Sequence, residues 1–225
     1  MKIFYKMTFC LDAKMIKPVG EKINNVVILL HGYGGDGNDI AALTINWKRF
    51  LPNTLFICPN GPEKCSINPM GYEWFDLNTE DEKYITEKAL ESEKILKKFI
   101  EEIKTKYNLH NSNICLSGFS QGCMMSINVG LSEKEKFAGI IGFSGKIINR
   151  NELGNRILSK PSTLLIHGDQ DEIVPPVNLL EAKDFFERNK IDITTKMLKG
   201  CGHNIPVEAS SLGLTFLKKI FNINS

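Results

Sequence analysis

The alternation of short apolar runs with amphipathic helical segments is the feature of this sequence that most restricts its fold. Residues 26–30, 137–143 and 163–167 are apolar at almost every position. Such runs are typical of strands covered on both faces, as in a parallel sheet. The longest expected helix is 85–107, where apolar residues recur every three to four positions and charges of both signs occupy the other face. This alternation predicts a doubly wound, mostly parallel sheet with helices on both faces.

The remaining expected elements continue the same order. Further strands are expected at 54–58, 113–117 and 191–198, and further helices at 121–131, 179–189 and 206–221. Residues 2–11 are expected to add one or two antiparallel strands at the sheet edge. A length of 225 residues suits one α/β domain, and no repeat, linker or low-complexity tract divides the chain. We therefore expect a single domain over residues 1–225.

Charge and cysteine content argue against several classes of protein. The formal net charge is +2 and both signs are interspersed, which argues against nucleic acid and anionic membranes as partners. No stretch approaches the roughly 18 apolar residues of a membrane span, and the first residues lack the apolar core of an export signal. The six cysteines show no metal-like spacing. We expect reduced thiols, no bound metal and a cytoplasmic location.

The strongest local signal is the pentapeptide Gly-Phe-Ser-Gln-Gly at residues 118–122. It lies between an expected strand and an expected helix, where a sharp turn would lift the Ser120 hydroxyl clear of the sheet at the helix amino end. Glycines at its two ends allow the close approach that such a strained turn needs. The pattern favours Ser120 as a nucleophile over an ordinary tight turn, and a serine hydroxyl needs a base to attack.

Acid candidates follow the expected strand at 163–167. Asp169, Asp171 and Glu172 all lie in the loop after it. We favour Asp171, which is farther out and could orient an imidazole. Asp169 could instead bind nearby backbone amides, as short Asx side chains do.

Among the four histidines, only His203 follows both the nucleophile and an acid-bearing loop. The order serine, acid, histidine is that of serine hydrolases built on this kind of sheet, so His203 is the predicted base. His31 and His167 each end an apolar strand and are expected to form hydrogen bonds within their loops, and His110 is expected to be solvated. A zinc site made from three of these histidines and Asp169 has no supporting spacing.

Backbone amides are expected to supply an oxyanion hole. One would come from Gln121, directly after the nucleophile, and the other from the glycine-rich loop at 31–35, with Tyr33 as the favoured donor. Residues 32–37 also match the G-x-G-x-x-G fingerprint of dinucleotide binding. That interpretation requires an acidic residue at the end of the next strand, where the sequence instead reads Cys-Pro-Asn at 58–60. No organic cofactor is expected.

The segments LLHGYGGDGND, GFSQGCMMS, LLIHGDQDEIVP and GCGHNI resemble the phospholipase/carboxylesterase family of α/β-hydrolases, which includes bacterial carboxylesterases and acyl-protein thioesterases. The similarity extends from about residue 26 to the last helix. It implies an α/β-hydrolase fold with no large cap domain and with Ser120, Asp171 and His203 in the triad positions. Tyr33 and Gln121 take the oxyanion positions. The family uses no metal or cofactor, and many members are homodimers.

The resemblance also bears on the substrate. Residues 72–76 resemble the family's W-F-D segment beside the acyl pocket, so Met70, Tyr72, Trp74 and Phe75 are expected to line an acyl site. Trp74 and Phe75 could equally anchor a polar loop. The expected function is a serine esterase that cleaves short- to medium-chain acyl esters or thioesters through an acyl-enzyme. The alternatives are an acyl-protein thioesterase, a lysophospholipase and a hydrolase-fold binding protein without activity.

Overall fold

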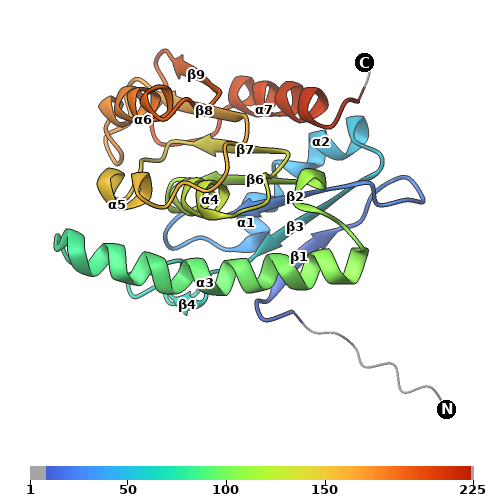
Figure 1. The fold of residues 1–225 in the computed structure, drawn as a ribbon, viewed down its shortest axis with the longest axis horizontal. Coiled ribbons are helices and arrows are strands. Elements are labelled where there is room, and N and C mark those ends of the chain that lie inside the picture. The colour runs from blue at the N-terminus through green and yellow to red at the C-terminus, as the bar shows by residue number, and fades with distance from the viewer. Residues whose placement is uncertain (1–8, 224–225) are drawn as a thin grey trace.

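The computed structural model describes residues 9–223 and has a seven-stranded sheet at its centre (Figure 1). The strand order is β1-β3-β2-β6-β7-β8-β9, with β1 antiparallel to β3 and the other five pairings parallel. The strands are β1 (Ala13–Ile16), β2 (Asn25–Leu30), β3 (Thr54–Pro59), β6 (Ile114–Phe119), β7 (Gly139–Phe143), β8 (Thr163–Gly168) and β9 (Ile193–Leu198). A separate two-stranded ribbon pairs β4 (Glu63–Lys64) with β5 (Tyr72–Glu73).

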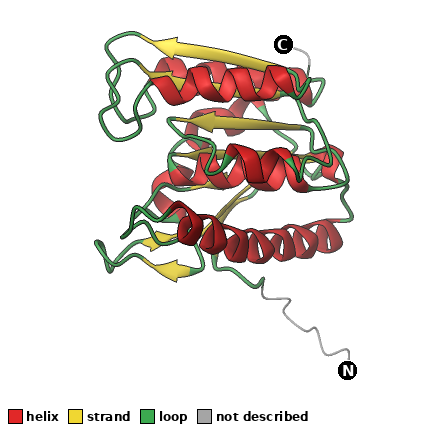
Figure 2. Cartoon of the chain, turned by 60° about the vertical axis from the view of Figure 1, so that its left-hand side comes forward, coloured by secondary structure: helices red, strands yellow, loops and turns green. Residues whose placement is uncertain are grey.

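Helices cover both faces of this sheet, as the alternation predicted. The α-helices are α1 (Gly37–Ala41), α2 (Thr44–Phe50), α3 (Glu82–Tyr107), α4 (Gln121–Ser132), α5 (Arg150–Gly154), α6 (Val177–Arg188) and α7 (Val207–Ile220). Helices α3, α4 and α6 pack on one face, and α1, α2 and α7 pack on the other. Figure 2 shows a layer of helices in front of the strands.

The central strand β2 shows why its sequence is apolar throughout. Val26, Ile28 and Leu30 face α3 and α4, whereas Val27 and Leu29 face the opposite helical layer, and all five are fully buried. Side chains alternate along a strand, so a strand between two helical layers needs apolar residues at every position. Each such burial stabilises the fold by about 1.5–3 kcal/mol.

The expected strands and long helices are confirmed to within two or three residues at each end. The antiparallel edge strand is Ala13–Ile16, beyond the segment 2–11 where it was expected; residues 2–8 of that segment lie outside the described part of the chain. The short helices α1, α2 and α5 and the β4–β5 ribbon were not predicted. None of the helices within residues 9–223 has an apolar stretch of the length that a membrane span requires.

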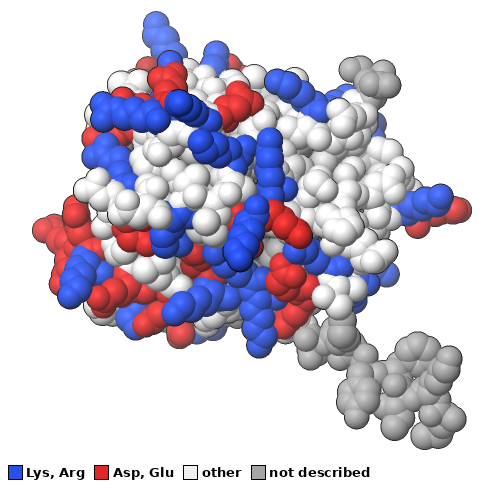
Figure 3. All heavy atoms as spheres, viewed as in Figure 1, with Lys and Arg blue, Asp and Glu red and all other residues white. Residues whose placement is uncertain are grey.

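Charged side chains of both signs are mixed on the face shown in Figure 3. One carboxylate on the charged face of α3 is buried instead of exposed to solvent. Glu93 is buried, and its Oε1 lies 2.9 Å from both Arg156 Nη1 and Lys97 Nζ. Burial opposes its ionisation, but these cations and the Ser132 hydroxyl hold the pKa of Glu93 below its ordinary value. This cluster ties α3 to α4 and to the chain after α5.

Candidate active site

Ser120 lies at the sharp turn between β6 and α4. Its backbone angles are φ 52° and ψ −116°, a left-handed conformation that side chains other than glycine rarely adopt. The Ser120 amide donates a hydrogen bond to the Phe143 carbonyl of β7 at 2.8 Å, which holds the turn against the next strand. The strained turn predicted from the pentapeptide is therefore present, and local packing maintains it.

Glycines flank this turn because backbone segments meet there without room for side chains. A Cβ atom at Gly118 would lie 2.2 Å from the Gly122 carbonyl group, and one at Gly122 would lie 2.2 Å from the Leu30 carbonyl oxygen. Both distances are far below van der Waals contact. The sequence of the turn is thus dictated by the packing of α4 against β2 and β6.

We expect Gly122→Ala to lower the free energy of unfolding by about 1–3 kcal/mol or more, because α4 must move away from β2 to admit a methyl group. Urea denaturation followed by circular dichroism would measure this loss. The matched control is Gly154→Ala at the end of α5, where the added Cβ would meet nothing closer than 3.7 Å. Equal unfolding midpoints for the two variants would contradict the packing argument.

Asp171 and His203 are joined directly. His203 Nδ1 lies 2.7 Å from Asp171 Oδ2, while Asp171 Oδ1 accepts the amides of Ile173 and Val174 at 3.0 and 2.8 Å. Burial of the carboxyl opposes its ionisation, but the His203 hydrogen bond and the two amides hold the pKa of Asp171 below its ordinary value. An ionised Asp171 fixes the imidazole with Nδ1 toward the carboxylate, which leaves Nε2 for other chemistry.

The other two acid candidates take different positions. Asp169 Oδ1 accepts the Gly200 amide at 2.6 Å and so ties the loop after β8 to the loop after β9. Glu172 is exposed. Of the three, Asp171 is the carboxylate that contacts His203.

His31 and His167 form hydrogen bonds within buried loops. In His31, Nδ1 donates to the Gly32 carbonyl at 2.7 Å and Nε2 accepts the Gly61 amide at 2.8 Å, a pattern that only the neutral ring can form. Burial lowers the pKa of His31, which favours the same form. In His167, Nε2 donates to the Val174 carbonyl at 2.8 Å and also lies 3.2 Å from Asp171 Oδ2. His167 thus helps to hold the loop after β8, which carries Asp171, in place.

The sharp turn at residues 118–122, called the elbow below, bears Ser120. His203 packs onto this elbow through Phe119, the residue that precedes Ser120. The Phe119 and His203 rings have centroids 4.7 Å apart. Gly32 also lies close to this turn, because an added Cβ there would lie 3.1 Å from Phe119 Cδ1 and 3.3 Å from Ser120 Cβ. Among the described side chains, Ser120 Oγ and the His203 ring do not form a hydrogen bond. Such bonds are often long in sites without substrate and shorten when it binds.

Two backbone amides beside Ser120 remain available to a ligand. Within the described residues, neither the Tyr33 nor the Gln121 N–H has an acceptor in the protein. The loop that carries Tyr33 is held by hydrogen bonds from the Gly34 amide to the Tyr72 carbonyl at 3.0 Å and from the Tyr72 amide to the Gly35 carbonyl at 2.8 Å. Free amides on fixed loops are what an oxyanion hole requires.

The side chain of Gln121 has a role that the sequence did not reveal. Its Oε1 accepts the Trp74 amide at 2.8 Å and its Nε2 donates to the Phe75 carbonyl at 2.6 Å. The Trp74 indole donates to the His31 carbonyl at 3.1 Å. Trp74 and Phe75 are buried, so they anchor the segment between β3 and α3 to the elbow.

None of the four residues expected to line an acyl site lines the cavity next to His203. Met70 is 83 % exposed, and the Tyr72 ring lies 3.7 Å below Lys64 Nζ. A cavity of about 410 Å³ adjoins His203, and neither these two residues nor Trp74 and Phe75 line it. Contact of the four residues with an acyl chain stays a prediction.

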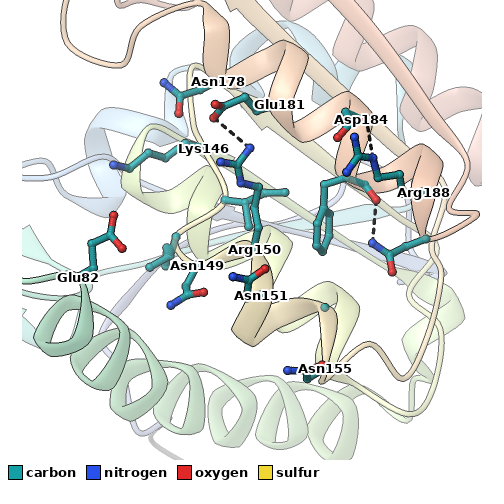
Figure 4. Close-up of a pocket in the computed structure, with 15 residues that line it drawn as sticks. Glu82, Lys146, Asn149, Arg150, Asn151, Asn155, Asn178, Glu181, Asp184 and Arg188 are labelled. Atoms are coloured by element: carbon teal, nitrogen blue, oxygen red, sulfur yellow. Dashed lines mark hydrogen bonds and ion pairs between the residues drawn. The ribbon is translucent and has the colours of Figure 1, made fainter.

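A larger cavity of about 910 Å³ lies between α5 and α6. Figure 4 shows its polar lining, with an ion pair between Arg150 and Glu181 at 3.4 Å. Neither Ser120, Asp171 nor His203 lines it. The candidate active site is therefore the smaller cavity, which shares His203 with the triad.

Comparisons with known proteins show which family this chain resembles along most of its length. The model of the phospholipase/carboxylesterase family matches residues 11–221. Acyl-protein thioesterase 1 of Aspergillus fumigatus is 32% identical, with 92% of each chain covered, and that of Gibberella zeae is 27% identical, with 92% of this chain and 95% of the relative covered. The crystal structure of esterase PE8 is 36% identical with a TM-score of 0.90, covering 93% of this chain and 99% of that one. The Bacillus cereus carboxylesterase, 18% identical over 94% and 95% of the two chains, has a TM-score of 0.78, a likeness of fold.

Proposed function

Because the chain belongs to the phospholipase/carboxylesterase family of α/β-hydrolases, we propose that Ser120, His203 and Asp171 are the catalytic triad of its serine hydrolase activity toward ester or thioester bonds. The observation that carries this assignment is the 2.7 Å hydrogen bond between His203 Nδ1 and the buried Asp171 carboxylate, beside the elbow that bears Ser120. No other described histidine combines a bound carboxylate with partial exposure.

The mechanism has two halves. Ser120 Oγ attacks the acyl carbon while His203 Nε2 takes its proton, and Asp171 stabilises the imidazolium that forms. The Tyr33 and Gln121 amides donate to the oxyanion. The alcohol or thiol leaves with the proton from His203, and water then hydrolyses the acyl-enzyme by the same route.

The proposed substrates are carboxylic esters with short or medium acyl chains. The similarity to an esterase at 36% identity supports ester bonds as the target, and the chain length is part of the proposal. Acyl-protein thioesterase activity is the second candidate, which the 32% identical relative favours. A cytoplasmic location and a homodimer remain predictions.

A fluorophosphonate probe and a panel of nitrophenyl esters from acetate to palmitate, with a palmitoyl thioester, would test this function. We expect covalent labelling of Ser120 and the highest kcat/KM on short or medium esters. A protein that neither labels nor turns over any ester would be a binding protein on a hydrolase fold. A clear preference for the palmitoyl thioester would support the second candidate.

A further inference from the structure

The cavity beside His203 has an apolar wall that the triad chemistry leaves unexplained. Its volume of about 410 Å³ lies within the range of roughly 300–1,000 Å³ typical of pockets that hold small ligands. The apolar wall consists of Ile40, Ala42, Leu43, Phe119 and Ile205. These residues come from α1, the chain before α2, the elbow and the loop after β9.

The position of His203 indicates which part of a substrate would enter this cavity. The Nδ1 edge of the ring faces Asp171, which does not line the cavity, so the opposite edge carries the free Nε2. In the mechanism proposed above, on which this inference rests, Nε2 must deliver a proton to the departing oxygen. The group attached to that oxygen therefore has to occupy space next to the imidazole.

The charged and polar residues of the lining restrict the chemistry of that group. No lysine or arginine is among the described lining residues, Asp39 contributes a carboxylate, and Tyr33 and Asn204 are uncharged polar side chains of the lining. An anionic group in this cavity would lose water without gaining a cationic partner, and it would meet a like charge. The wall thus suits a compact, uncharged apolar group.

We propose that this cavity is the leaving-group subsite and that it holds the compact, uncharged apolar alcohol portion of a carboxylic ester. In the step concerned, the bond between the acyl carbon and the alcohol oxygen breaks and its electron pair stays on that oxygen. The oxygen takes the proton that His203 Nε2 received from the Ser120 hydroxyl. The products are the Ser120 acyl ester and the free alcohol, which leaves from among Leu43, Phe119 and Ile205.

This subsite separates the ester substrates from other acylated molecules. A lysophospholipid would place a phosphate-bearing group next to His203, and an acylated protein would place a polar main chain there. The phosphate would find no cationic partner in the described lining, and most of the polar main chain would face the apolar wall. The subsite therefore favours small esters as substrates.

The test compares acetate esters of three alcohols with one acyl group, so that only the leaving group varies. Acetate release would give kcat/KM for ethyl acetate, benzyl acetate and 4-carboxybenzyl acetate. We expect benzyl acetate to exceed ethyl acetate by about tenfold or more, and the carboxylated ester to fall about tenfold or more below benzyl acetate.

Leu43→Trp would fill the cavity, and the control Ile45→Trp adds the same ring two residues further on, at a position that is 63 % exposed and outside the lining. Leu43→Trp is expected to lower the ratio of benzyl to ethyl kcat/KM by about tenfold, whereas Ile45→Trp leaves this ratio unchanged. Fluorophosphonate labelling of Ser120 in both variants reports that the elbow is intact.

The possible results separate a failure of the leaving-group subsite from a failure of the catalytic triad. Equal kcat/KM for the three acetates, all lost in Ser120→Ala, would overturn the subsite and leave the triad standing. An altered acyl-chain preference in Leu43→Trp at an unchanged alcohol ratio would assign the cavity to the acyl group instead. Turnover of all three acetates by Ser120→Ala would overturn the triad itself.

Discussion

Ser120→Ala should lower kcat for a nitrophenyl ester by about a millionfold, to the residual rate that substrate binding and the oxyanion donors alone provide. The variant should keep the fold, because alanine only removes the hydroxyl from a turn fixed by the backbone bond to Phe143. Burst and steady-state assays on freshly purified protein would measure the loss. The matched control is Ser126→Ala on α4, whose hydroxyl donates a hydrogen bond to the Gly122 carbonyl of the same helix and which should keep most of the activity.

The same experiment can show whether the triad acts as a unit. His203→Ala alone should cost about as much as Ser120→Ala, and the double variant should lose no more than either single one. Losses that multiply in the double variant would mean that the two side chains serve separate steps.

Asp171→Asn should lower kcat by about ten-thousandfold, with little change in the position of the loop. An asparagine amide that turns its NH₂ group toward His203 favours the wrong tautomer of the ring, with Nε2 protonated and unable to accept the Ser120 proton. The control is Asp169→Asn, which removes the contact to Gly200 but leaves the His203 partner in place. A loss in Asp169→Asn as large as in Asp171→Asn would contradict the assignment of Asp171 as the acid of the triad.

Asp171 also links stability to pH. Its pKa is lower in the folded protein than its ordinary value near 4, so folding is favoured by the ionised form. This contribution is complete at neutral pH and is lost as the pH falls through the folded pKa. Urea unfolding of wild type and Asp171→Asn at a series of pH values should therefore show a gap that narrows below about pH 4.

The fold was predictable because its two strongest signals are local. The continuous apolar runs of β2, β7 and β8 need only the chain itself to be recognised, and they correspond to strands covered on both faces. The short helices α1 and α2 were not predicted, because segments of five and seven residues are too short to show helical periodicity. Helix α1 begins at a capping box between Asp36 and Asp39, directly after the glycine-rich loop at 31–35, and this signal is present in the sequence.

The site was predictable as an order of residues but not as a set of contacts. The sequence places Asp169 and Asp171 in one loop, and only the path of that loop turns one carboxylate to His203 and the other to Gly200. The clamp by Gln121 on the segment that carries Trp74 joins positions 47 residues apart. No periodic pattern in the sequence predicts this contact. The apolar wall that includes Leu43 depends in the same way on elements that converge only after folding.

The strands that precede the three triad residues differ in how many neighbouring strands they pair with. Ser120 and Asp171 follow β6 and β8, each of which has a partner on both sides, whereas His203 follows β9, an edge strand bonded to β8 alone. An edge strand is held by hydrogen bonds on one side, so its detachment breaks fewer of them than the opening of β6 or β8, and such local openings cost less than global unfolding. On warming, detachment of this strand would carry the proton acceptor away from an otherwise intact molecule. The enzyme would then lose activity reversibly at temperatures below the midpoint of global unfolding.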